Sequence, residues 1–215
     1  MIVRIATQSD AAAQTLAFQP VEEQGAAQPC PSADRENMNM LQIETARLRL
    51  VACTIEAVQA ALSDRDGLAA LLSARVPEDW PQADLRDFLP LYARIADARA
   101  AAAGWGIWLI LLERERELVG DVGFKGAPGD GIVEIGYSVL PPRRGHGYAG
   151  EAARALTEWA LAQPGVRRVT AECLEDNLAS IRVLEKIGMR PIGRTDEGLL
   201  WAIERPDAEP VRSSQ

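Results

Sequence analysis

One segment limits what this chain can fold into more than any other: residues 133–152, VEIGYSVLPPRRGHGYAGEA. Alternating apolar side chains predict a strand over residues 132–140, and the alanine-rich run after Gly147 predicts a helix over residues 148–163. A strand that passes through a glycine loop directly into a helix places bare backbone amides at the positive end of that helix. The segment therefore predicts a site for an anion.

The composition of the loop indicates that the anion is a phosphate group. The amides of Gly145 and Gly147 have no Cβ beside them, and Arg143 and Arg144 carry guanidinium groups that suit phosphate. A nucleotide P-loop would need Gly-Lys-Ser or Gly-Lys-Thr, which the segment lacks. A dinucleotide fingerprint belongs to the first strand of its fold, whereas more than 130 residues precede this loop. A tight turn that only joins strand to helix stays an alternative.

A second motif follows at residues 175–189, EDNLASIRVLEKIGM, after a strand predicted over residues 166–173. Asn177 and Ser180 are good residues for the start of a helix, and Gly188 is a good residue for its end. Apolar side chains at helical spacing lie between them. Helix capping alone would explain Asn177 and Ser180, so the motif gains its weight from the glycine loop before it.

The two motifs, in this order and at this spacing, resemble the GNAT superfamily of acetyl-coenzyme A dependent N-acetyltransferases. The likeness is closest to the RimJ/RimL-like subgroup, which includes ribosomal-protein N-terminal acetyltransferases, and it covers roughly residues 41–204. It implies acetyl-coenzyme A as cofactor, no metal, and direct transfer to an amine acceptor, either a protein N-terminus or a small molecule. A non-catalytic sensor of acetyl-coenzyme A and a nucleotide-binding protein remain the alternatives.

The resemblance also implies which residues bind the cofactor. They are Val139, Leu140, Arg143, Arg144, Gly145, His146, Gly147, Tyr148, Ala149, Asn177 and Ser180. In this family a backbone N–H near the end of the strand, here that of Val139 or Leu140, stabilises the oxyanion. A bulge over residues 138–141 would turn these amides toward the cofactor. Pro142 stands where the family usually has Gln or Arg, so phosphate binding is expected to depend on the two arginines and the backbone.

Two residues are expected to move protons. An amine must be neutral before it attacks, although its pKa is ~7.7 to ~10.4, so a base is needed. Glu134 is the candidate, because several relatives carry a base on this strand; pairing with a surface Arg is its alternative role. Ser180 is the candidate general acid, since Leu184 stands where many relatives have a tyrosine.

The order of the predicted elements gives the fold class. A strand over residues 46–51 and helices over residues 54–62, 68–73 and 84–102 precede three consecutive strands over residues 105–112, 117–124 and 132–140, and a hairpin over residues 190–193 and 199–204 closes the chain. We expect an α/β (α+β), GNAT-like fold: a mixed, mostly antiparallel central sheet of about six to seven strands, with helices on both faces.

The ends of the chain differ from its middle in composition. Residues 1–40 are rich in Ala, Gln, Pro and small polar residues without a sustained period, so we expect a disordered N-terminal extension. Residues 41–205 are expected to form a single acetyltransferase domain, and residues 206–215 a loose tail.

Charge and cysteine content bear on partners and location. The net charge of −8 argues against nucleic acid or an anionic membrane as partner and favours an amine or a cationic peptide, although such a charge is also common in surfaces that only keep a protein in solution. Cys30, Cys53 and Cys173 lack metal-binding or redox spacing and indicate reduced thiols. We expect a cytoplasmic protein, either a monomer or a homodimer.

Overall fold

The computed structural model describes residues 40–95, 103–196 and 198–206. The extension expected over residues 1–40 and the tail expected over residues 206–215 lie outside the described residues, apart from Met40 and Pro206. The last part of the helix expected over residues 84–102 lies outside them as well.

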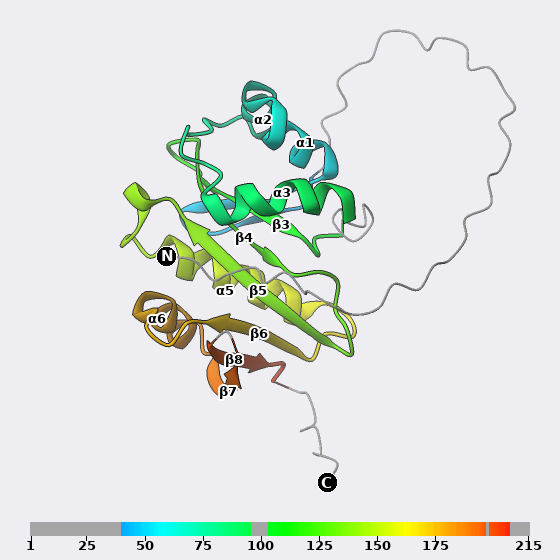
Figure 1. Ribbon diagram of the computed structural model, residues 1–215, viewed down its shortest axis with the longest axis vertical. Helices are drawn as coiled ribbons and strands as arrows, with labels where there is room; N and C mark the ends of the chain where they lie inside the picture. Colours follow the sequence, from blue (N-terminus) through cyan, green and yellow to red (C-terminus); the bar gives the residue numbers. More distant parts are fainter. Residues whose placement is uncertain (1–39, 96–102, 197, 207–215) are drawn as a thin grey trace, which may run out of the picture. The chain divides into compact units, whose positions relative to one another are not determined.

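Eight strands form one sheet in the order β1-β2-β3-β4-β5-β6-β8-β7 (Figure 1). Every pair of neighbours is antiparallel except β5 and β6, which are parallel. The strands are β1 (Gln42–Glu44), β2 (Leu48–Ala52), β3 (Ile107–Leu112), β4 (Glu117–Phe124), β5 (Ile132–Val139), β6 (Arg168–Cys173), β7 (Arg190–Thr195) and β8 (Gly198–Glu204). The expected mixed, mostly antiparallel sheet is confirmed. The strand count is higher than expected because β1 was missed.

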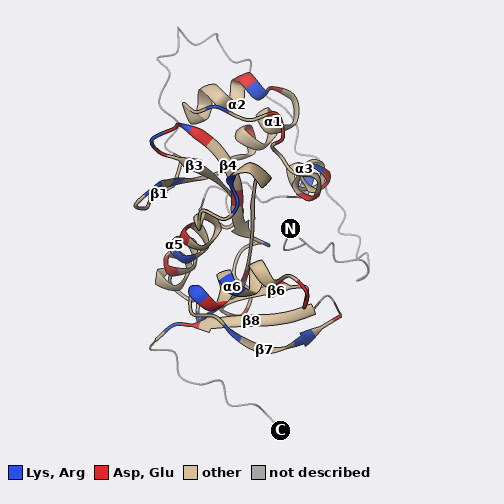
Figure 2. Ribbon diagram, turned by 90° about the vertical axis from the view of Figure 1, so that its left-hand side faces the viewer, with Lys and Arg blue, Asp and Glu red and all other residues tan. Residues whose placement is uncertain are grey.

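Helices cover both faces of the sheet, as the sequence predicts (Figure 2). On one face lie α1 (Ile55–Ser63), α2 (Arg65–Leu72) and α3 (Ala83–Ile95), and on the other lie α5 (Tyr148–Ala162) and α6 (Leu178–Lys186). Polar side chains begin three of these helices by accepting a hydrogen bond from a first-turn amide: Thr54 from Ala57, Asp64 from Gly67 and Asn177 from Ser180.

The alternation of side chains along the strands sorts the interior into two cores. Ile135, Tyr137 and Val139 of β5 lie in the core beneath α5 and α6, together with the fully buried Trp108. Leu140 lies in the core beneath α1–α3, together with Trp80. Glu134, Gly136 and Ser138 therefore face the α3 side of the sheet.

The sheet opens between β5 and β6. These strands pair only over residues 132–134 and 168–170, although β5 runs on to Val139 and β6 to Cys173. On its other edge β5 keeps an unbroken register with β4 up to Val139, so the bulge expected over residues 138–141 was wrong. The opening arises because β5 loses its partner on one side. A short 3-10 helix, η1 (Pro141–Arg143), follows at once.

Candidate functional site

The glycine loop lies between η1 and α5, at the end of β5 where the sheet is open. Gly145 and Gly147 have left-handed backbones, with φ of 80° and 82°, and Gly147 is the N-cap of α5. Within the described residues, the backbone amides of residues 145–149 donate to no acceptor. A Cβ added at Gly145 would have no heavy atom within 4 Å, so the space beside its amide is open. Unpaired amides in open space at a helix N-terminus suit a phosphate group.

The two loop arginines hold the loop in place instead of extending from it. Arg143 pairs with Glu117 at 2.5 Å, and Arg75 pairs with the same buried carboxylate at 2.7 Å. Arg144 donates from Nε to the carbonyl of Val139 at 2.9 Å, and from a terminal nitrogen to Oε1 of Gln82 at 2.8 Å. Direct phosphate contact by these arginines stays a prediction, since each would first have to leave a protein partner.

Arg47 is a residue of the site that the sequence did not reveal. Its guanidinium pairs with Glu151 on α5 at 2.6 Å, donates to the carbonyl of His146 at 2.9 Å and lies 4.8 Å from the ring centre of Tyr148. The chain separation between Arg47 and Glu151 is 104 residues, so no local pattern indicates the contact. The start of β2 is thereby fastened to the glycine loop.

His146 folds back on the loop. Its exposed ring stacks on Tyr148 with 5.5 Å between ring centres, and Nδ1 lies 2.9 Å from the carbonyl of Arg144. The partly buried Ala149 occupies the first turn of α5, as expected, next to these residues. The imidazole thus supports the shape of the loop on its outer side.

Glu151 provides a test of this fastening. Burial tends to raise the pKa of Glu151, but hydrogen bonds from Thr45 and Arg47 outweigh it and hold the pKa below its ordinary value. A lowered pKa contributes stability above the unfolded-state pKa, and the contribution is lost as the pH falls through the folded-state pKa.

We therefore expect Glu151→Gln to be less stable than the wild type at pH 7 and to approach it below about pH 4, near the ordinary carboxyl pKa. Urea unfolding of both proteins at pH 7 and pH 3.5 measures this. The exposed Glu158→Gln, on the same helix, is the matched control and should show no such difference. An equal difference at both pH values would contradict the assigned role of the charge.

Of the two N–H groups expected as oxyanion donor, those of Val139 and Leu140, only the Val139 N–H is available. The Leu140 N–H donates to the carbonyl of Val119 at 2.9 Å and is therefore occupied. Successive residues of a strand point their N–H groups to opposite edges, so the Val139 N–H points away from β4, toward the opening. The Val139 carbonyl, which lies on that same edge, accepts from Arg144 instead of from a strand.

The first turn of α6 lies across the opening. Asn177 and Ser180 are both buried, and Oδ1 of Asn177 accepts from the Ser180 N–H at 3.2 Å. Tyr137 of β5 spans the gap, because its hydroxyl donates to the Ser180 carbonyl at 3.3 Å. Burial raises the pKa of Tyr137 far above its ordinary value, so its hydroxyl stays protonated. Leu184, where relatives carry a tyrosine, is a fully buried core residue.

Glu134 lies nearer the start of β5, in the last residue pair that joins this strand to β6. Its carboxylate forms an ion pair with Lys125, and Lys125 also lies 3.7 Å from Glu172. Val139 follows Glu134 by five positions, which is about 16 Å along an extended strand. The structure thus brings Val139, Ser180 and the glycine loop together, and places Glu134 outside direct reach of them.

A cavity of about 750 Å³ runs beside α5, away from the opening. Ile43 and Thr45 line it on the β1 side, Gly147, Gly150 and Arg154 on α5, and Lys186 at the end of α6. It continues from the glycine loop and has room for a further part of a long ligand.

The described residues also bear on membranes and metal ions. No helix among them is both long and apolar enough to cross a membrane. In the same part of the chain, no three His, Cys, Asp or Glu side chains gather as metal ligands would.

Comparison with known proteins gives one consistent result. The model of a family described as "Acetyltransferase (GNAT) domain" matches residues 47–190. The uncharacterized N-acetyltransferase YjdG of Bacillus subtilis (strain 168) is 35% identical over 150 residues, which cover 69% of this chain and 89% of YjdG.

Solved structures agree with this result. A GNAT-family acetyltransferase from Bacillus anthracis superposes with a TM-score of 0.53 at 26% identity, over 78% of this chain and 100% of that one. RimL, a ribosomal L7/L12 alpha-N-protein acetyltransferase solved with coenzyme A, superposes with a TM-score of 0.55 over 76% of this chain and 98% of RimL. Its identity of 21% shows the shared fold alone.

Proposed function

Because the chain belongs to the GNAT family and is an acetyltransferase that depends on acetyl-coenzyme A, we propose that it transfers an acetyl group directly to a primary amine, either a protein N-terminus or a small molecule. The observation that carries the proposal is the opening between β5 and β6, which ends at unpaired loop amides. In this proposal the arm of the cofactor would pass through the opening, from the loop amides to the polar side chains on the α3 face.

The residues present fit the cofactor. The amides of residues 145–149 would hold its phosphates, and Asn177 and Val139 would flank its arm within the opening. The cavity along α5, which Arg154 and Lys186 line together with Glu44, Glu151 and Glu158, would take its remaining part. Acetyl-coenzyme A, when bound, supplies the acetyl thioester.

Three groups of the chain would serve the transfer. The Val139 N–H would stabilise negative charge on an oxygen in the opening. The Ser180 hydroxyl, which lies beside the hydroxyl of Tyr137, would donate a proton on the α6 side. Glu134 would accept a proton from the α3 side through water, because its distance from Val139 excludes direct contact.

Ser180→Ala tests the proton donor. We expect kcat to fall about 100-fold, the low end of general acid catalysis, while the Kd of acetyl-coenzyme A stays within about twofold. Release of the coenzyme A thiol, followed by a thiol reagent at saturating amine, measures kcat. The exposed Ser63→Ala is the control and should behave as wild type. An unchanged kcat in Ser180→Ala would assign the proton to another group.

Turnover distinguishes an acetyltransferase from the alternative function, a non-catalytic sensor. An acetyltransferase releases thiol when an amine is added, whereas a sensor binds acetyl-coenzyme A without releasing it. Thiol release with at least one member of a panel of primary amines is expected; binding without release across the panel would favour the sensor.

A further inference from the structure

Asp121 of β4 is a buried carboxylate that the proposed transfer has not used. It lies opposite Ser138 in the β4–β5 register, on the α3 face of the sheet, and accepts a hydrogen bond from Oγ of Ser138 at 2.8 Å. No Lys or Arg of the described residues forms an ion pair with it. Asp121 is buried, with 9% of its surface exposed.

Burial makes the negative charge of Asp121 energetically unfavourable. Burial raises the pKa of Asp121 to about 6, although Ser138 and the nearby indole of Trp80 act to lower it. The Trp80 N–H is itself buried, at 1% exposure, and has no hydrogen bond of normal geometry. A buried carboxylate without a cation destabilises a fold unless a ligand supplies the missing positive charge.

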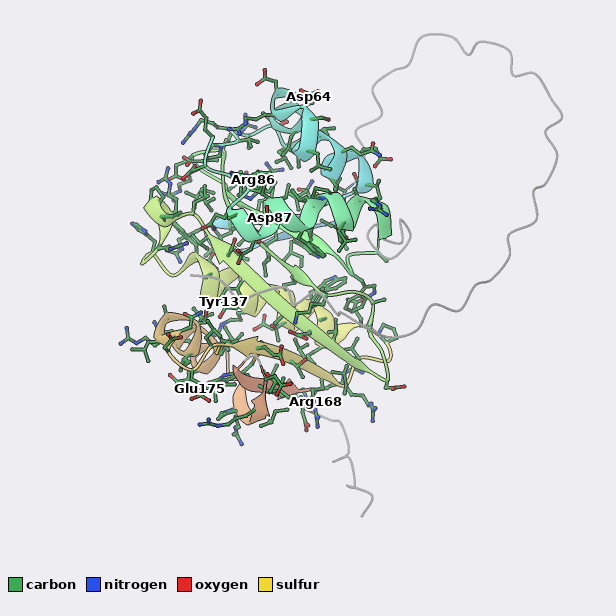
Figure 3. The ribbon with its side chains drawn as sticks, in the orientation of Figure 1. Asp64, Arg86, Asp87, Tyr137, Arg168 and Glu175 are labelled. Carbon is green, nitrogen blue, oxygen red and sulfur yellow. The ribbon has the colours of Figure 1, made fainter. Side chains whose placement is uncertain are left out.

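Hydrogen bonds connect Asp121 to the opening. Ser138 accepts from Nε2 of Gln82 at 3.1 Å, Oε1 of Gln82 accepts from Arg144, and Arg144 donates to the Val139 carbonyl. Gln82 immediately precedes α3, which lies over the sheet on this side with Arg86 and Asp87 in its first turns (Figure 3). Asp121 is therefore one strand and one residue away from the Val139 amide, much nearer than Glu134.

We propose that Asp121 binds the ammonium group of the acceptor and takes its proton directly, in place of the transfer through water to Glu134, so that the acceptor is a cationic primary amine entering from the α3 side. The inference rests on the proposed acetyl transfer. One N–H bond of the ammonium breaks, an O–H bond forms on Asp121, and the nitrogen keeps the electron pair with which it attacks. A buried site favours this step, because it replaces an ion pair by two neutral groups.

The test compares Asp121→Asn, which keeps an acceptor for Ser138 but removes the charge, with two other variants. Glu134→Gln removes the other candidate base, and Glu172→Gln on β6 is the matched loss of a carboxylate on the same face of the sheet. The probes are n-butylamine, benzylamine and a tetrapeptide with a free N-terminus. Binding to the protein saturated with coenzyme A is measured by calorimetry, and turnover with acetyl-coenzyme A by thiol release from pH 5 to 9.

For the best probe, we expect Asp121→Asn to weaken amine binding at least 30-fold and to lower kcat/KM at least 100-fold, with the Kd of acetyl-coenzyme A unchanged within twofold. Glu172→Gln, at a carboxylate with no role in the proposed transfer, should change both quantities less than tenfold. Equal amine binding by wild type and Asp121→Asn, a larger loss in Glu134→Gln, or no binding of any probe to the wild type would overturn the proposal. Amine binding that needs Asp121 but gives no thiol release would instead refute the acetyl transfer and leave the ammonium site standing.

The pH dependence separates a charge role from a structural one. Wild-type kcat/KM should rise with pH through about 6, as Asp121 loses its proton, and this limb should be absent in Asp121→Asn. Other titratable groups around Asp121 do not explain a limb there, since burial raises the pKa of Cys53 to about 12 and also raises that of Tyr92 on α3. Arg144 reaches Asp121 only through Gln82 and Ser138. A limb near pH 6 that persists in Asp121→Asn would overturn the proposal.

The stability of the fold tests the cost of the Asp121 charge without any ligand. A carboxyl whose folded-state pKa is raised costs stability as the pH rises from its unfolded-state pKa to its folded-state pKa, and the cost is complete above the folded-state pKa. Asp121→Asn should therefore have a higher urea midpoint than wild type at pH 8 and nearly the same midpoint at pH 4. A lower midpoint at pH 8 would show that the charge serves the fold, and would overturn the premise of the site.

Discussion

Gly145→Val should weaken the binding of acetyl-coenzyme A at least 100-fold. Gly145 has a φ of 80°, which a β-branched residue adopts only with strain, and the space beside its amide is open. Valine would either move the loop or place two methyl groups where a phosphate must approach the amides of residues 145–149. Isothermal titration calorimetry measures the loss.

Gly193→Val is the matched control for this substitution. Gly193 lies in β7, has no positive φ, and a Cβ built on it meets no heavy atom within 4 Å. It should bind acetyl-coenzyme A as the wild type does. Retained binding in Gly145→Val, with a urea midpoint like that of the wild type, would show that the loop does not hold the cofactor.

Gly120→Ala should lower the free energy of unfolding by about 3 kcal/mol, at the upper end of the usual cost of overpacking. A Cβ at Gly120 of β4 would lie 2.2 Å from the Ser138 carbonyl oxygen and 3.0 Å from Cα of Val139. Both atoms belong to the backbone of β5, which cannot rotate away as a side chain can. The substitution therefore pushes β5 at the place where the oxyanion donor lies.

Gly136→Ala, on β5 itself, is the control for Gly120→Ala. A Cβ at Gly136 would meet no heavy atom within 4 Å, so we expect a change of less than about 0.5 kcal/mol, typical of a surface substitution. Equilibrium unfolding in urea compares the two variants with the wild type. If Gly120→Ala is as stable as Gly136→Ala, then β4 and β5 are not packed as closely as described.

Much of the fold follows from local sequence patterns. The helix α6 shows this clearly: Asn177 caps its start, and Gly188, with φ of 89°, follows its end, both as predicted. By contrast β1 has three residues, too few to show an alternation, and is stabilised by its pairing with β2. The opening of the sheet is likewise a property of strand pairing, and the sequence suggested a bulge in its place.

The residues of the candidate site fall into two groups, those that local sequence indicates and those that only folding brings together. The glycine loop and the Asn177 motif are contiguous, so their residue types and spacing indicate their chemistry. Arg47, Tyr137 and Asp121 matter through contacts with residues between 17 and 104 positions away, which only the folded sheet brings about. An arginine before a strand, a tyrosine within a strand and an aspartate within a strand are all ordinary in sequence. No local signal therefore marks these three residues.

In the proposed function, the glycine loop holds acetyl-coenzyme A and the acetyl group passes to an amine. The most direct measurement is calorimetric titration of the full chain with acetyl-coenzyme A, coenzyme A, and ATP with magnesium, followed by thiol release with the amine panel. We expect micromolar binding of acetyl-coenzyme A, lost in Gly145→Val and retained in Gly193→Val, with thiol release when a suitable amine is added. No binding of acetyl-coenzyme A, or a preference for ATP with magnesium, would contradict the account.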